Sequence, residues 1–135
     1  MDELKIGQAA KLAGISIETI RFYERQGLLE KPPRSQAGYR CYSAKTLARI
    51  KFIKRAKELG FSLKEISELL SLRVDPDTTC AMVKSRATVK ISDIESKIET
   101  LQNMKRALVK LTKSCRGDGP TSKCPILDFL ESQAD

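Results

Sequence analysis

The sequence predicts a mainly α-helical protein: a winged helix-turn-helix domain, then a long coiled-coil helix, then a C-terminal loop with a short helix. Three observations predict this class. The first 75 residues carry short apolar segments at helical spacing, separated by Gly, Ser and Pro. Residues 81–113 contain neither Pro nor Gly. Beyond them, a stretch with two glycines and a proline between two cysteines predicts a loop.

A helix-turn-helix is predicted near the start of the chain. Residues 6–13 form a short apolar helical face that Gly14 ends, because glycine commonly follows a helix C-terminus. Ser16 is a suitable N-cap for a second helix over residues 17–26, which Gly27 ends. Two short helices joined by three residues are typical of a helix-turn-helix.

A wing is predicted after the second helix. Pro32, Pro33 and Gly38 interrupt any helical spacing. Residues 39–42, Tyr-Arg-Cys-Tyr, alternate as a short strand would, so we expect a strand there.

Two further helices are predicted before residue 75. Ser43 can cap a helix that runs to about residue 59, and Gly60 stops it. Residues 62–65, Ser-Leu-Lys-Glu, form a capping box that opens the next helix. Residues 75–77, Asp-Pro-Asp, then interrupt the chain and end a first domain, residues 1–75.

A single long helix is predicted over residues 81–113, within a linker and dimerisation segment, residues 76–113. At 1.5 Å per residue it would be about 50 Å long. Its apolar stripe cannot be covered by so small a chain, so we expect a coiled-coil dimer, parallel or antiparallel; the alternative is packing on the chain's own N-terminal domain. The stripe consists of Ala87, Ile91, Ile94, Ile98, Leu101, Met104, Leu108 and Leu111.

Charge and composition favour a polyanionic partner. The net charge is +8, and residues 1–75 carry 15 Lys and Arg against 9 Asp and Glu, whereas residues 76–135 carry 10 against 8. The N-terminal half is therefore the candidate for nucleic-acid binding. No apolar run is long enough to span a membrane and no signal-peptide core is present, so we expect a cytoplasmic protein without a membrane partner.

The second helix and the wing both combine cations with hydroxyl groups. Such side chains can contact phosphate oxygens and base edges, although a plain surface helix would also carry them. Ile20 and Phe22 lie on other faces and are expected to anchor the helix to the core. The candidate DNA contacts are Thr19, Arg21 and Tyr23 of the helix and Arg34, Tyr39 and Arg40 of the wing.

Four cysteines and no histidine define the remaining chemistry. Cys115 and Cys124 bound a loop, and Cys80 precedes the long helix. Thiolates without imidazole suit soft or borderline d10 metal ions, or redox chemistry through a Cys115–Cys124 disulfide. Cys41, in the wing, is expected to be structural.

Several segments together resemble the MerR family of metal-responsive transcription regulators over nearly the whole chain. They are IGQAAKLAGISIETIRFYERQGLL, GYRCYS, RAKELGFSLKEISELL and the CPIL tail. The resemblance implies a winged-helix domain, an antiparallel coiled-coil homodimer and a metal-binding loop, residues 114–135, at the dimer interface. It further implies a palindromic promoter operator that the metal-bound dimer distorts, so that RNA polymerase aligns with both promoter elements.

The resemblance also assigns residues. Arg21 and Tyr23, with Arg34, Tyr39 and Arg40 of the wing, would contact DNA. Arg55, in the later helix pair, is a weaker candidate for a contact with the DNA backbone from a second wing. The long helix holds Cys80 about 50 Å from Cys115, so Cys80 would complete the metal site only with Cys115 and Cys124 of an antiparallel partner subunit.

The metal is expected to be divalent: Zn, Cd, Pb or Hg. Within the family a cysteine at the Cys80 position accompanies divalent-ion sensors, and this chain has Thr79-Cys80-Ala81. The segment LSLRVDPDTTC looks most like the zinc-responsive branch, but that branch also carries a second adjacent cysteine and a histidine in the loop. Here Ser114 precedes Cys115 and no histidine exists, which argues against a two-zinc site.

Other function classes fit less well. A redox-sensing regulator would leave Cys80 without a role, and a metal buffer would not need the basic N-terminal half. An enzyme is not expected, because the sequence shows no histidine, no glycine-rich phosphate loop and no paired nucleophile and base.

Overall fold

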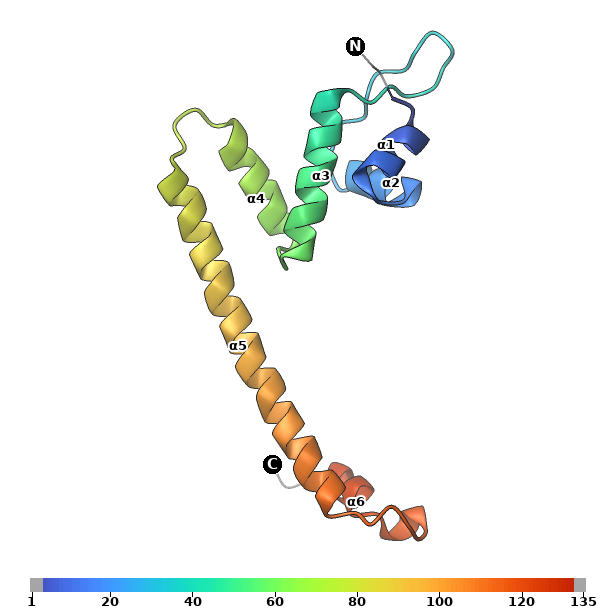
Figure 1. Cartoon of the computed structure of the whole chain (residues 1–135), viewed down its shortest axis with the longest axis vertical. Coiled ribbons are helices and arrows are strands. Elements are labelled where there is room, and N and C mark those ends of the chain that lie inside the picture. Colours follow the sequence, from blue (N-terminus) through green and yellow to red (C-terminus); the bar gives the residue numbers. More distant parts are fainter. Residues whose placement is uncertain (1–3, 133–135) are drawn as a thin grey trace. The chain divides into compact units, whose positions relative to one another are not determined.

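The computed structural model describes residues 4–132, and within that range the protein is helical (Figure 1). The mainly α-helical class is thus confirmed. The helices are α1 (Ile6–Ala13), α2 (Ile17–Arg25), α3 (Ala44–Glu58), α4 (Leu63–Val74), α5 (Cys80–Lys113), the 3-10 turn η1 (Thr121–Lys123) and α6 (Pro125–Glu131).

Three serines begin helices as the sequence predicts. The Ser16 hydroxyl accepts from the backbone N–H of Thr19 at the start of α2, and Ser43 does the same for α3. Ser62 and Glu65 form the predicted capping box of α4, with the Glu65 carboxylate accepting from the Ser62 N–H at 2.8 Å. Each side chain satisfies backbone donors that the first turn of a helix leaves unpaired.

The segment between α2 and α3, which we call the 30–42 loop, differs from the prediction. We expected a short strand at residues 39–42, but residues 4–132 contain only two isolated antiparallel bridges, Leu4 with Tyr42 and Arg34 with Arg40. Proline explains the short pairing: the Pro33 carbonyl accepts from the Cys41 N–H at 2.9 Å, but Pro33 has no N–H to return.

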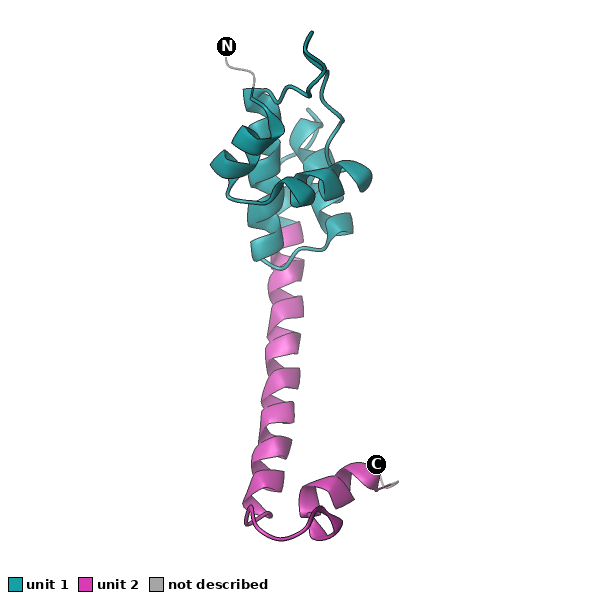
Figure 2. Cartoon of the chain, turned by 90° about the vertical axis from the view of Figure 1, so that its right-hand side faces the viewer, with its two compact units in different colours: residues 1–85 teal, residues 86–135 magenta. Residues whose placement is uncertain are grey.

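The chain divides into two compact units, one ending at Ser85 and one beginning at Arg86 (Figure 2). In the first unit α1 packs against α2 and α3, and α3 packs against α4. This arrangement buries a small apolar core and brings α2 and the 30–42 loop to one surface. The fully buried large side chains are Ile20, Tyr42, Ile50, Ile53 and Ile66.

Helix α5 is continuous over 34 residues, which corresponds to about 50 Å of rise. Its apolar stripe is exposed in the single chain: Ile94 is 39% exposed and Leu101 is 62% exposed. No helix in residues 4–132 has both the length and the apolar character needed to cross a membrane.

Candidate DNA-binding surface and cysteine loop

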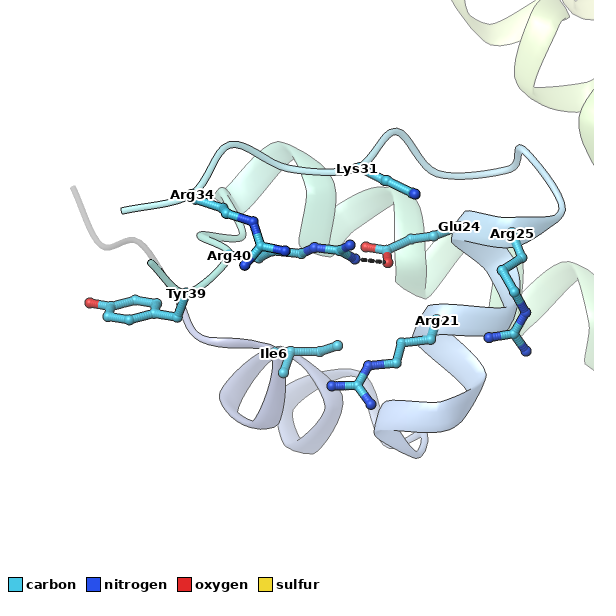
Figure 3. A pocket seen from close by; sticks show the side chains of 8 residues that line it. All are labelled: Ile6, Arg21, Glu24, Arg25, Lys31, Arg34, Tyr39 and Arg40. Carbon is cyan, nitrogen blue, oxygen red and sulfur yellow. Dashed lines mark hydrogen bonds and ion pairs between the residues drawn. The ribbon is translucent and has the colours of Figure 1, made fainter. Parts of the chain in front are cut away.

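A basic cavity of about 450 Å³ opens between α2, the 30–42 loop and the start of α1 (Figure 3). Five cations and one acid line it, so its charge suits a polyanion. The cavity brings together four residues that the sequence singled out: Arg21, Arg34, Tyr39 and Arg40. The full lining is Ile6, Arg21, Glu24, Arg25, Lys31, Arg34, Tyr39 and Arg40.

The elements explain why these cations share a surface. Arg21 and Arg25 are four residues apart on α2, so they lie on one helical face. Lys31 enters from the other side, on the 30–42 loop (Figure 3). Arg25 and Lys31 were not among the predicted DNA contacts. The four-residue spacing from Arg21 could have identified Arg25, whereas Lys31 depends on how the loop folds back.

Local contacts hold the side chains of the 30–42 loop. Arg34 donates to the Gly38 carbonyl at 2.7 Å. The Lys5 ammonium lies 4.6 Å from the centroid of the Tyr39 ring, within cation–π range. Arg40 pairs with Glu24 of α2, with 2.6 Å between Nη1 and Oε1. The loop therefore presents its cations on a partly fixed frame.

The faces of α2 differ in part from the prediction. Ile20 is fully buried, as expected, but Phe22 is 38% exposed and does not anchor the helix. Tyr23 is buried instead, because a residue three positions after Ile20 returns to the same face, and burial raises the pKa of its phenol. A phosphate contact by Tyr23 would have to use its small exposed fraction, and it stays a prediction.

Two other predicted DNA contacts lie outside the cavity lining. Thr19 is half-buried, and its hydroxyl lies 2.7 Å from that of Ser16, so it supports the start of α2. Arg55 is exposed in the last turn of α3. Both assignments stay predictions.

Cys115 and Cys124 line one cavity of about 420 Å³, formed by the loop between α5 and α6. Both are half-buried free thiols. Gly117 and Gly119, with φ of 82° and 89°, turn the chain back through a region that other residues rarely adopt. The Gly117 N–H lies 3.4 Å from the Cys115 sulfur and donates to it. The loop thus brings two soft donors to one space and gives one of them a backbone donor.

Cys80 is the first residue of α5 and is exposed. No group of three His, Cys, Asp or Glu side chains that could hold a metal occurs within residues 4–132. The predicted ligand set of Cys80, Cys115 and Cys124 is therefore not assembled in the described part of one chain. Cys41, at the end of the 30–42 loop, is buried and forms no disulfide.

Comparison with known proteins places this architecture in a family. The profile described as MerR HTH family regulatory protein matches residues 4–72, and the one described as MerR, DNA binding matches residues 47–111. The chain is 42% identical to the HTH-type transcriptional regulator ZntR of Escherichia coli (strain K12), over 96% of this chain and 94% of that one. The chain belongs to the MerR family. The helix-turn-helix prediction for α1 and α2 is thereby confirmed, and this MerR-family chain is a DNA-binding transcription regulator.

Two solved structures of transcription regulators match nearly the whole chain. The transcription regulator PbrR691 from Ralstonia metallidurans CH34, in complex with lead(II), has a TM-score of 0.81 at 35% identity, covering 94% of this chain and 98% of that one. The transcriptional regulator MerR from Bacillus megaterium MB1, in complex with mercury(II), has a TM-score of 0.73 at 38% identity, covering 96% and 100%.

Proposed function

We propose that this chain is a metal-responsive regulator that binds a palindromic promoter operator as a homodimer in the cytoplasm and activates transcription when a divalent soft or borderline ion binds. The observation that carries the proposal is the pair of sites in one MerR-family chain. A basic cavity lies on the helix-turn-helix unit, and two thiols share a loop cavity beyond α5.

The DNA-binding half would be a winged domain, residues 1–75, with the 30–42 loop as its wing. Arg21 of α2 and Arg34, Tyr39 and Arg40 of the loop would contact DNA, and their common cavity supports this. Thr19, Tyr23 and Arg55 complete the proposed set without that support.

The dimer would be an antiparallel coiled coil of α5, within residues 76–113. The exposed apolar stripe supports pairing, because a solvated stripe of this length is costly to leave uncovered. A helix of 34 residues separates Cys80 from Cys115. Only an antiparallel partner could bring Cys80 beside Cys115 and Cys124 of the partner subunit.

The metal-binding segment would be residues 114–135, and the ion would be Zn, Cd, Pb or Hg. Three sulfur donors with no histidine in the chain suit such ions, because thiolates are soft ligands. Relatives described with lead(II) and mercury(II) support the same group of ions.

Activation would work through the shape of the DNA. Untwisting and kinking a promoter costs on the order of several kcal/mol, and a dimer that holds two half-sites can offset that cost with its contacts. Ion binding would favour one of two dimer geometries, by no more than its differential affinity for them. RNA polymerase at the same promoter would then engage both promoter elements.

The decisive experiment is divalent-metal competition on the purified, reduced dimer, comparing Cys80→Ser with Cys41→Ser. We expect Cys80→Ser to lose at least about tenfold in metal affinity, as for loss of a ligand or its support. Cys41→Ser should keep the wild-type affinity. Full divalent affinity in Cys80→Ser would exclude the site shared between subunits.

A thiol-based redox regulator is the second candidate, because Cys115 and Cys124 are free thiols of one cavity. It would switch by forming a disulfide between them and would need no metal. A reduced protein that binds no divalent ion, together with DNA binding that changes on oxidation, would favour it over the metal-responsive function.

A further inference from the structure

Glu24 is the one acid among the eight residues that line the basic cavity. It projects from α2 toward the 30–42 loop (Figure 3). Its side chain is 2% exposed, so the carboxylate is almost completely removed from water. A buried acid beside a surface that should bind a polyanion needs a physical explanation.

Both oxygens of this carboxylate hold the same arm of the loop. Oε1 accepts from Nη1 of Arg40 at 2.6 Å, and Oε2 accepts from the hydroxyl of Tyr42 at 2.8 Å. Arg40 and Tyr42 are two residues apart, so in an extended segment they point to the same side. One α2 side chain therefore fastens two neighbouring positions of the loop.

The base of the loop is already held by its backbone. Leu4 and Tyr42 exchange hydrogen bonds of 2.9 and 2.7 Å, and Cys41 donates to Pro33. This backbone pairing does not fix the direction of the Arg40 side chain, which is 26% exposed. A free arginine side chain loses much rotamer entropy when it is fixed, because it has many rotatable bonds. The contact with Glu24 removes that freedom before any ligand binds.

Stability alone does not explain this arrangement. Burying an ion pair costs desolvation energy that often equals its attraction, so an apolar pair of similar volume would serve the core as well. The carboxylate does give a defined direction to the arginine. Its position supports a role in orientation.

We infer that Glu24 is a positioning residue for DNA binding: it fixes Arg40 of the loop relative to Arg21 and Arg25 of α2, so that both elements meet the DNA backbone as a preformed set. This inference rests on the proposed DNA contacts. It adds a residue that does not itself touch DNA.

Simple electrostatics predicts the opposite effect of removing this charge. Replacing Glu24 by Gln makes the cavity more positive, and a more positive surface should bind DNA more tightly. A loss of affinity in Glu24→Gln would therefore identify positioning, because neither charge nor shape otherwise accounts for it.

The test compares full-length wild type, Glu24→Gln, Arg40→Gln and the double variant. The probe is a duplex that the wild-type protein selects from a random-sequence pool, with Kd measured over a range of salt. We expect about a tenfold loss for Glu24→Gln and a salt slope smaller by about one phosphate contact. Arg40→Gln should show the same loss of DNA affinity and the same smaller salt slope. The double variant should bind DNA no more weakly than either single variant.

Arg21→Ala is the positive control. When it is combined with Glu24→Gln, the two losses of DNA affinity should add. Affinity equal to or above wild type in Glu24→Gln, or additive losses in the double variant, would overturn the inference. If Arg40→Gln also binds normally, the proposed loop contact fails and the inference fails with it. If Arg40→Gln alone weakens binding, only the inference fails.

Thermal unfolding and metal stoichiometry accompany each Kd, so that misfolding is seen directly. If Glu24→Gln does not fold, Tyr42→Phe carries the test, because it removes only the hydrogen bond to Oε2. We then expect about a threefold loss of affinity, in the range of one weakened hydrogen bond. Unchanged affinity in folded Tyr42→Phe would contradict the inference.

Discussion

Tyr42 is a fully buried side chain with a polar end, and its protonation is coupled to folding. Burial, followed by the hydrogen bond to Glu24 and the Glu24 charge, raises its pKa from 10.0 to about 12, and Arg40 opposes this rise. The folded protein therefore holds this proton more tightly than the unfolded chain does. A phenol can in this way make the free energy of unfolding depend on alkaline pH.

We predict that the free energy of unfolding falls as the pH rises from about 10 to about 12. In this window the unfolded chain releases the Tyr42 proton and the folded chain keeps it, so rising pH favours unfolding. Below pH 10 the contribution is fully present. Tyr42→Phe should be less stable by about 1 kcal/mol at pH 7, through loss of a buried hydrogen bond, and should show a shallower alkaline decline.

Urea unfolding of wild type and Tyr42→Phe, at pH 7 and at several pH values above 9, measures the free energy of unfolding. Tyr39→Phe, at an exposed ring, is the matched control and should follow wild type. An equally steep alkaline decline in Tyr42→Phe would show that other groups cause it. Tyr42→Phe should still show a smaller alkaline decline in the free energy of unfolding, because burial also raises the pKa of Tyr23.

At the scale of helices, the starts of α2, α3 and α4 depend on side chains within three residues of each helix start. Ser16, Ser43 and Ser62 each accept from a backbone N–H three residues later. Such contacts are local, so they can be recognised from sequence spacing alone.

We predict that Ser62→Ala lowers the free energy of unfolding by about 1 kcal/mol, because it leaves an N-terminal donor of α4 unpaired. Ser67→Ala, an exposed position inside the same helix, is the control and should change stability by less than about 0.5 kcal/mol. Chemical unfolding midpoints at neutral pH provide the comparison. Equal effects of the two substitutions would mean that the cap does not stabilise α4.

The difference between local contacts and packing between elements explains which features the sequence predicted. Helix order and caps follow from local patterns, and so did Arg21, Arg34, Tyr39 and Arg40 as candidate contacts. The burial of Tyr23, the exposure of Phe22 and the approach of Lys31 depend on how α2 and the loop pack, which no local pattern contains. The absent strand at residues 39–42 depends on a partner segment that carries proline.

At the scale of the whole molecule, one helix links the two proposed functions. The exposed stripe of α5 would be the dimer seam, and the partner would supply the Cys80 that each loop lacks. Dimerisation and metal binding then form one equilibrium, because each ligand set requires two chains. A site made only of Cys115 and Cys124 of one chain would, in contrast, bind metal independently of the seam.

We predict that Leu101→Glu in the middle of this stripe weakens the dimer and metal binding together. A carboxylate buried in an apolar seam costs on the order of several kcal/mol, and an antiparallel dimer would bury two. Asn103→Glu adds the same charge about 200° further around the helix, so it should leave both properties unchanged. Sedimentation equilibrium and divalent-ion titration on the same reduced samples provide the two measurements. A monomeric Leu101→Glu protein that keeps full metal affinity would show that Cys115 and Cys124 need no partner thiol. A Leu101→Glu dimer as tight as the wild-type dimer would show that the stripe is not the seam.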